Sequence, residues 1–438
     1  MSILRRLEQQ YRAIVGATRP AVPEQPRPDA GERPTLQAGQ IDVRDLIARY
    51  DHTKHAELAD AYFAPLMNNA ILRRKPFTDL RESVQILTGL SHAIEGLRLY
   101  PQVNVLDFGA GTSWSSRILA SLKCRVTALD VSKNALEIGR SIHQEDPLTR
   151  DLPIDFRVFD GRSIPAESGT FDRILSFDAF HHVPDQRSML AEFSRVLRDD
   201  GIAAFVEPGP YHSLMPSSQI EMRAFNVIEN DIRVDEIWSI ARACGFADIK
   251  LSFSMPRQEL VPLDDFNRFI ETRTVPDDVV FSRGNLEVHR NRRVFFLYKS
   301  ASREADSRFI EGLNYRLQLV DVTPVDADSV RLTLVVENTG SATWLPSGFE
   351  PGNVNVGMHL KAADGTLLDN DFGRLPISRD RVVQGQKRDI VEVLRLPDAG
   401  DFNLELDLVA ESIIWFEIVG GSPLTLSFRG RKYVDAAR

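Results

Sequence analysis

The feature that most constrains the fold is a glycine turn set between two apolar runs, each of which ends at an acid. Residues 103–106 form the first apolar run, which meets Asp107, and glycines follow at Gly109 and Gly111. A helix-type stretch then leads to a second apolar run that ends at Asp130. Strand, glycine turn, helix, strand and acid in this order are typical of a nucleotide-type cofactor site at the carboxyl edge of a parallel sheet.

The residue types of this turn fit a particular kind of ligand. Gly109 and Gly111 have no Cβ, so a bound molecule can lie directly against the backbone there. Glycine also adopts φ values that other residues disfavour. The carboxylate of Asp130 is placed to accept hydrogen bonds from two ribose hydroxyls. Asp107 and Trp114 disfavour a dinucleotide, because a carboxylate and an indole are poor neighbours for a pyrophosphate. Asp107 instead suits a cationic ligand that carries an amino group.

These motifs resemble the S-adenosylmethionine site of the class I methyltransferases, over about residues 60–300. In that family the first-motif acid and glycines hold the methionyl end, the acid after strand two holds the ribose, and an acid near strand three reaches the adenine amino group. The resemblance implies S-adenosylmethionine as the cofactor and methyl transfer as the reaction. By position it assigns cofactor binding to Asp107, Gly109, Gly111, Asp130, Asp160, Gly161 and Asp178.

Apolar runs predict seven strands in this part of the chain. The expected strands are residues 103–107, 125–130, 154–159, 172–177, 201–207, 247–253 and 292–299. Helical stretches separate them, for example residues 234–246. The alternation predicts an α/β fold with a doubly wound, mostly parallel sheet. Residues 292–299 are expected to form the last strand and to lie inside the sheet. Residues 101–300 are therefore assigned to the cofactor-binding domain.

Three segments precede this domain. Residues 1–16 place apolar side chains at helical spacing, which predicts an amphipathic helix for docking or oligomerisation rather than membrane contact. Residues 17–40 hold five prolines among polar residues and predict an extended linker. Residues 41–100 are expected to be mostly helical and to cap the cofactor pocket. Their basic string at 73–77 favours a solvated helix end, with contact to an acidic substrate as the alternative.

The sequence pattern changes near residues 302–308, beyond which alternation and regular turn signals predict an all-β sandwich over residues 305–438. Residues 398–416 loosely resemble immunoglobulin-like and glycan-binding modules of bacterial polysaccharide enzymes. The resemblance implies contact with a glycan or a protein, and packing or dimerisation is the alternative. Trp344 and Trp415 are candidates for stacking on a sugar ring, although tryptophan in a sandwich is more often part of the core.

Candidate catalytic residues follow the fourth and fifth strands. His181 and His182 come after strand four, and Glu207 and His212 come at the end of strand five, so all four are expected at one sheet edge. Histidine suits general-base work near neutral pH. No tight ligand spacing indicates a metal, and a zinc site of His181, His182 and Glu207 is a minor alternative. The loop at 178–181 lacks the Asn/Asp-Pro-Pro-aromatic pattern of adenine-type N-methyltransferases, which argues against nucleobase amines.

Composition limits the partners. The net charge of −9 argues against a broad nucleic-acid-binding face. The two cysteines exclude a disulfide scaffold and a cysteine-rich zinc site, and both are expected to be packed thiols. No apolar run reaches the roughly 18 residues of a membrane span. The N-terminal residues lack an apolar signal core, which predicts a cytoplasmic protein.

Together these features predict a methyltransferase that uses S-adenosylmethionine and acts on a saccharide or other small-molecule acceptor, most readily at oxygen. The sandwich favours a role in bacterial surface polysaccharide biosynthesis, an association that rests on fold analogy. Two alternatives stay open: a non-catalytic scaffold that senses S-adenosylmethionine or binds glycan, and a C-methyltransferase of a lipid or quinone. A dehydrogenase is disfavoured by Asp107 and Trp114 in the turn.

Overall fold

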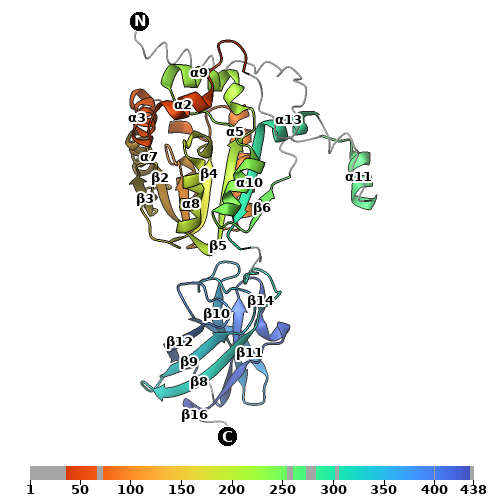
Figure 1. Cartoon of the computed structure of the whole chain (residues 1–438). Helices are drawn as coiled ribbons and strands as arrows, with labels where there is room; N and C mark the ends of the chain where they lie inside the picture. Colours follow the sequence, from red (N-terminus) through yellow and green to blue (C-terminus); the bar gives the residue numbers. More distant parts are fainter. Residues whose placement is uncertain are drawn as a thin grey trace. The chain divides into compact units, whose positions relative to one another are not determined.

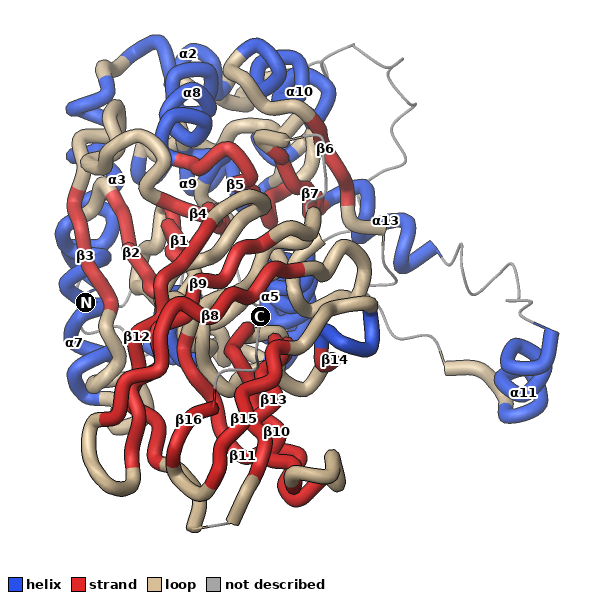
Figure 2. The backbone as a smooth tube through the Cα atoms, turned by 90° about the horizontal axis from the view of Figure 1, so that it is seen from below, coloured by secondary structure: helices blue, strands red, loops and turns tan. Residues whose placement is uncertain are grey.

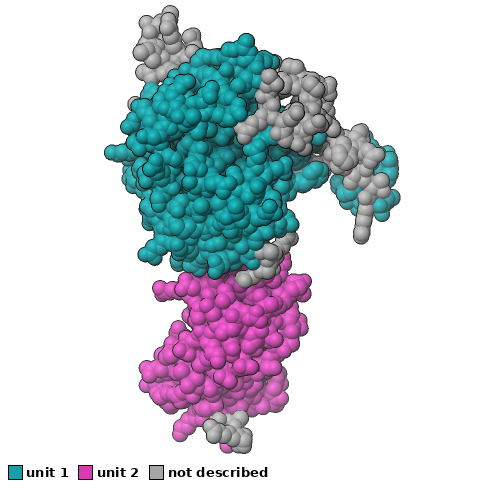
Figure 3. Space-filling view, viewed as in Figure 1, with its two compact units in different colours: residues 1–301 teal, residues 302–438 magenta. Residues whose placement is uncertain are grey.

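The structure is a computed structural model that describes residues 36–66, 73–253, 260–272, 283–300, 305–398 and 400–434. The chain divides into two compact units, residues 1–301 and 302–438 (Figure 3). The predicted helix at 1–16 and most of the predicted linker at 17–40 lie outside the described residues. Among the helices that the structure does describe, none has the length and apolar character needed to cross a membrane.

The N-terminal unit is built on a seven-stranded sheet. Its strands are β1 (Asn104–Phe108), β2 (Arg125–Asp130), β3 (Ile154–Val158), β4 (Phe171–Phe177), β5 (Leu197–Pro208), β6 (Asp248–Leu251) and β7 (Arg292–Tyr298). Their order is β3-β2-β1-β4-β5-β7-β6, which can be followed from edge to edge in Figure 2. Strands β1 to β5 pair in parallel, and β7 runs antiparallel to both of its neighbours. The predicted fold class and the inner position of the last strand are confirmed.

Helices lie on both faces of this sheet. Those before β4 are α2 (Val43–Arg49), α3 (His52–Phe63), η1 (Ala64–Leu66), α5 (Leu80–Leu97), α6 (Trp114–Ser121) and α7 (Lys133–Glu145). Those after β4 are η2 (Phe180–His182), α8 (Gln186–Val196), η3 (His212–Leu214), α9 (Pro216–Phe225), α10 (Val234–Ala243), α11 (Leu263–Thr272) and α13 (Arg283–Asn291). The helix expected at 234–246 thus ends three residues early, where Gly245 takes a positive φ of 99°.

Alternation along the inner strands divides the apolar side chains between the two faces. Phe205 of β5 and Phe295 of β7 stack at 4.6 Å and share one core with residues of α8 and α10. Their neighbours along the strands point to the other face, which α5 covers. There α5 approaches so closely that a Cβ on Gly96 would lie 2.1 Å from the ring of Phe296. Burying each phenylalanine stabilises the fold by about 1.5–3 kcal/mol.

The helices before the first strand attach to elements that border the carboxyl edge. Asp60 of α3 accepts hydrogen bonds from Ser132 Oγ at 2.9 Å and from the backbone N–H of Asn134 at 2.8 Å, at the start of α7. Helix α2 shares an apolar cluster with α9, in which Leu46 and Met222 are buried. Figure 1 shows α2 and α9 next to each other beyond the sheet.

The C-terminal unit is a sandwich of antiparallel sheets, as predicted. Its strands are β8 (Tyr315–Pro324), β9 (Ser329–Asn338), β10 (Val354–Ala362), β11 (Leu367–Pro376), β12 (Lys387–Arg395), β13 (Phe402–Ala410), β14 (Ile414–Trp415), β15 (Leu424–Arg429) and β16 (Lys432–Val434). One sheet has the order β12-β9-β8, and the other runs β11-β10-β13-β15-β16 with β14 paired to β13. A single apolar core lies between them.

The two tryptophans of the sandwich have different environments. Trp344 is fully buried in the core and meets Phe416 edge to face at 6.1 Å, so it is not available to stack on a sugar. Trp415 is partly exposed and contacts the ring of His359 at 4.0 Å and the guanidinium of Arg374 at 4.9 Å. The stacking expectation is therefore wrong for Trp344 and stays a prediction for Trp415.

Candidate functional site

The glycine turn after β1 is shaped to leave room beside the backbone. Gly109 and Gly111 have positive φ values of 64° and 52°. A Cβ on Gly109 would lie 2.4 Å from the Cβ of Ala179, so this position lets the turn approach the loop after β4. A Cβ on Gly111 would meet nothing within 4 Å. The open space at Gly111 is what a cofactor lying against the turn requires.

Asp107 is a buried acid directly below this turn. Its side chain is 1 % exposed, and its Oδ2 accepts hydrogen bonds from Ser115 Oγ at 2.7 Å and Ser116 Oγ at 2.5 Å. Burial raises the pKa of Asp107 to about 6, although the two hydroxyls oppose the shift. A cationic ligand group beside this carboxylate would favour its ionised form and lower that pKa.

Asp130 fixes the turn from the neighbouring strand. Its Oδ2 accepts a hydrogen bond from the N–H of Gly111, and its Oδ1 accepts one from the N–H of Ser132, both at 2.8 Å. Burial raises the pKa of Asp130, while these backbone donors and the nearby charge of His182 oppose the rise. Each carboxylate oxygen keeps a lone pair for a further donor, such as a ribose hydroxyl.

The remaining predicted cofactor residues follow β3 and β4. Asp160 accepts two backbone N–H bonds from its own turn, at 2.8 and 2.9 Å, which lower its pKa, and Gly161 has a φ of 78°. Asp178 has a positive φ of 49° and forms an ion pair with Arg292 at 3.0 Å. Burial opposes its ionisation, but the charges of Arg292 and Lys75 outweigh burial and lower the pKa of Asp178 to about 2.

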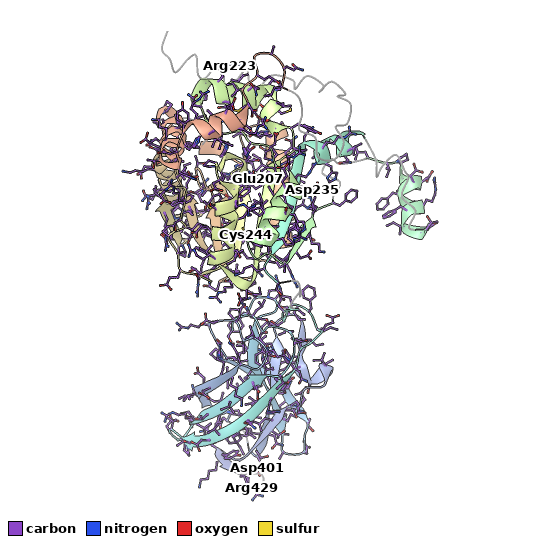
Figure 4. All side chains as sticks on the ribbon, in the orientation of Figure 1. Glu207, Arg223, Asp235, Cys244, Asp401 and Arg429 are labelled. Carbon is purple, nitrogen blue, oxygen red and sulfur yellow. The ribbon has the colours of Figure 1, made fainter. Side chains whose placement is uncertain are left out.

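Glu207 lies at the end of β5, within the fold (labelled in Figure 4), and both of its oxygens are engaged. Oε1 accepts hydrogen bonds from Ser176 Oγ at 2.9 Å and from the N–H groups of Ala179 at 3.1 Å and Phe180 at 2.8 Å. Oε2 accepts the Nδ1–H of His181 at 2.7 Å. Glu207 is therefore placed to hold the loop after β4 and to orient His181, rather than to approach an acceptor itself.

Burial controls the protonation of this pair. It raises the pKa of Glu207 to about 7, with a further rise from the charge of Asp178. It also lowers the pKa of His181 well below its usual value, and neighbouring His182 and His212 lower it further. A neutral imidazole whose Nδ1–H is given to a carboxylate presents Nε2 as an acceptor.

His182 and His212 surround His181 on its other sides. The ring centroid of His181 lies 3.9 Å from that of His182 and 4.9 Å from that of His212. His182 is the most exposed of the three, and its Nδ1 donates to the carbonyl of Ile228 at 2.5 Å. The four catalytic candidates from the sequence thus meet in one cluster, as their positions after β4 and β5 predict.

Glu229 joins this cluster and was missed by the sequence analysis. Its Oε2 lies 2.7 Å from His212 Nε2, and its Oε1 lies 3.6 Å from His182 Nδ1. Burial opposes its ionisation, but the hydrogen bond from His212 and the neighbouring histidines lower the pKa of Glu229 to about 2. Only its acidic type directly after two apolar residues could have marked it.

The structure also brings ligand-type atoms together where the sequence indicated no metal. One atom each from His181, His182 and Glu229 lies within 4.8 Å of the others. Glu207 is not part of this set, because its oxygens are taken by the loop and by His181. The zinc set considered from sequence, His181, His182 and Glu207, shares its two histidines with this group and differs from it in the acid.

Comparison with known proteins agrees with this geometry. Residues 106–205 match a family described as a methyltransferase domain. The chain is 35% identical over 136 residues to a sarcosine/dimethylglycine N-methyltransferase from Halorhodospira halochloris, covering 31% of this chain and 46% of that protein. It is 28% identical over 167 residues to the O-methyltransferase cnsE from Penicillium expansum, covering 36% and 57%.

A third relative is a ubiquinone biosynthesis O-methyltransferase from Xanthomonas campestris, 29% identical over 119 residues, which cover 25% of this chain and 48% of that protein. The chain thus spans about half the length of these relatives, and the family match at residues 106–205 lies in its N-terminal unit. That unit carries a class I, Rossmann-like methyltransferase domain of the S-adenosylmethionine-dependent kind.

Proposed function

We propose that this chain transfers a methyl group from S-adenosylmethionine to a small-molecule acceptor. The observation that carries the proposal is that two groups of residues lie at the same edge of the sheet. One group is the acids and glycines around the turn, and the other is the histidine–carboxylate cluster after β4 and β5. They are adjacent, because Gly109 of the turn lies against Ala179, whose N–H donates to Glu207 of the cluster. A cofactor site and a set of polar side chains for an acceptor therefore lie side by side.

The residues of the turn fit the parts of the cofactor. The buried carboxylate of Asp107 suits the cationic methionyl end, and the open space at Gly111 admits the backbone-facing side of the ligand. Asp130 suits the ribose hydroxyls, and Asp160, exposed after β3, suits the adenine amino group. When bound, the cofactor supplies an electrophilic methyl group, and the protein must place a nucleophile in line with it.

On the acceptor side, His181 is the residue best placed to receive a proton. Glu207 orients its ring through Nδ1, which leaves Nε2 directed away from the carboxylate. His182 and His212 line the same cluster and are placed to hold the acceptor. We propose an oxygen acceptor, and more specifically a saccharide hydroxyl, because the appended sandwich with its partly exposed Trp415 suits glycan contact. The cytoplasmic location and the role in surface polysaccharide biosynthesis stay predictions.

The test begins with the cofactor. Titration of the full chain with S-adenosylhomocysteine is expected to give one binding event, which Asp107→Asn and Asp130→Asn weaken by more than about tenfold, since each removes a charge-assisted hydrogen bond. Asp151→Asn, which alters an exposed acid, serves as the control. Absence of binding by the folded wild-type chain would overturn the proposal.

Turnover then identifies the acceptor class. Methyl transfer is measured with a panel of sugars and nucleotide sugars, small amines and quinols, each with S-adenosylmethionine. Methylated sugar is the expected product. Methylation of only amines or quinols would support the proposed methyl transfer but overturn the proposed saccharide acceptor. Cofactor binding without turnover on any acceptor class or on glycans extracted from cells would favour the non-catalytic scaffold.

A further inference from the structure

We propose that His181, His182 and Glu229 form a binding site for one divalent transition-metal ion of the zinc type. Ligand atoms of these three side chains all lie within 4.8 Å of one another. Two atoms bound to the same tetrahedral zinc ion at about 2.0–2.1 Å lie roughly 3.4 Å apart. Side-chain movements that shorten the separations of the ligand atoms by up to about 1.4 Å therefore close the site around an ion.

The hydrogen bonds behind the two histidines support a ligand role. Metal-bound histidines usually donate their second ring N–H to a carboxylate or a backbone carbonyl, which fixes the ring and its tautomer. His181 donates Nδ1–H to the buried carboxylate of Glu207 at 2.7 Å, and His182 donates Nδ1–H to the carbonyl of Ile228 at 2.5 Å. These bonds hold both rings in the tautomer with Nε2 as the acceptor, and Glu229 Oε1 lies 3.6 Å from Nδ1 of His182.

The acid of the site is supported in the same way. Glu229 is buried, and His212 holds its Oε2 through Nε2 at 2.7 Å, which leaves Oε1 on the side of His182. Close by, Glu221 has a buried Oε2 with no hydrogen-bond partner among the described residues, and its carboxylate acts on that of Glu229. A cation at the cluster would compensate both carboxylates.

Packing of the rings favours an ion over protonated histidines. Three imidazole rings with centroid separations of 3.9 and 4.9 Å would repel one another if all carried a charge. One divalent ion supplies positive charge while each imidazole stays neutral. Two imidazoles and a carboxylate suit zinc, iron, cobalt or nickel, whereas magnesium and calcium prefer oxygen ligands.

Three protein ligands leave coordination positions open for a further ligand. The cluster borders the cofactor turn, since Gly109 of the turn lies against Ala179, two residues before His181. If the proposed methyl transfer is correct, an ion here would bind the acceptor oxygen and orient it toward the methyl group. This consequence rests on the proposed function, but the metal site itself does not.

The experiment uses the full chain, stripped of metal with a chelator, and a chromophoric chelator that competes for Zn²⁺. We expect one equivalent of Zn²⁺ to bind and an excess of Mg²⁺ not to displace it. His182→Ala changes an exposed side chain and Glu229→Gln keeps the side-chain shape; each is expected to weaken Zn²⁺ binding by more than about 100-fold. His92→Ala, which alters a histidine outside the group, is the matched control.

Substitution with Co²⁺ gives a second readout. A visible absorption band of nitrogen-bound Co²⁺ is expected in the wild-type chain and in His92→Ala, and its loss is expected in His182→Ala. A wild-type chain without stoichiometric binding, or equal binding by wild type, His182→Ala and Glu229→Gln, would overturn the metal site. S-adenosylhomocysteine binding is measured on the same samples, so failure of the cofactor site and failure of the metal site are separate results.

Discussion

The two units of this chain both bury carboxylates, but they surround them differently. In the sandwich, Asp407 is fully buried, and its oxygens accept hydrogen bonds from the hydroxyl of Tyr315 and the N–H of Glu417. These donors come from β8 and η4, so the acid ties separate elements of the sandwich to β13. Each oxygen has a donor from the same unit, and the acid serves the fold.

The methyltransferase unit instead collects buried acids at one edge of its sheet. Asp107 and Asp130 lie on neighbouring strands, and the charge of Asp130 adds to the rise in the pKa of Asp107. Burying like charges together is unfavourable unless a ligand compensates them. The two units therefore differ in where their buried acids lie: Asp407 ties separate elements of the sandwich together, whereas Asp107 and Asp130 lie on adjacent strands beside the glycine turn proposed to hold the cofactor.

Glu207 tests this comparison most severely, because it lies at the ligand edge but is satisfied by its own unit. Glu207→Ala is expected to reduce the free energy of unfolding of the N-terminal unit by about 3–5 kcal/mol, since it leaves two backbone N–H groups and His181 without their buried acceptor. Calorimetric unfolding of the full chain measures the change. A loss below about 1 kcal/mol would show that water replaces the carboxylate.

Asp107 is expected to show the opposite behaviour. Asp107→Asn keeps an oxygen for Ser115 and Ser116, which both donate to the same atom, and removes the buried charge. Because folding raises the pKa of Asp107 from 3.8 to about 6, the ionised group destabilises the fold above pH 6 and not below pH 4. The two-unit shift corresponds to about 3 kcal/mol.

The variant is therefore expected to be more stable than wild type at pH 7.5, by up to about 3 kcal/mol, and equally stable at pH 3.5. Chemical denaturation at the two pH values measures this, and S-adenosylhomocysteine binding is expected to be weakened in the same protein. A variant less stable than wild type at pH 7.5 would contradict the idea that this acid is kept for a ligand.

The sequence predicted the features that depend on local pattern. Apolar runs and glycine turns are properties of short segments, so the seven strands, the inner position of β7 and the edge where His181 and Glu207 meet could be predicted. Strand β5 begins at Leu197 rather than 201, because Leu197 pairs with Phe171 of β4 before an irregularity in the register, after which Ile202 pairs with Arg173.

What could not be predicted depends on contacts between distant segments. Glu229 lies 21 residues beyond the end of β5, and only the docking of the loop after α9 brings it to His212 and His182. Trp344 carries no local sign that distinguishes it from Trp415, since burial of its ring depends on residues of both sheets. Whether every oxygen of a buried acid has a hydrogen-bond donor likewise depends on contacts between distant segments.

Tyr315 provides the corresponding test in the sandwich. Tyr315→Phe removes one of the two donors to Asp407 and leaves a buried acid partly unsatisfied, so the sandwich is expected to lose about 1–3 kcal/mol of stability. Unfolding followed by calorimetry measures the loss, and S-adenosylhomocysteine affinity is expected to stay unchanged. A weakened cofactor affinity would contradict the assignment of this acid to the fold alone.

Two glycines allow the smallest and most closely matched comparison. Gly111 in the cofactor turn and Gly365 in the sandwich both have positive φ, and a Cβ at either would meet nothing within 4 Å. Alanine at each position is therefore expected to cost a similar amount, about 1–2 kcal/mol of backbone strain. Only Gly111→Ala places its methyl group in the space assigned to the cofactor, so only this variant is expected to weaken S-adenosylhomocysteine binding beyond its effect on stability. Equal binding by the two variants would mean that the open space at Gly111 is not where the cofactor lies.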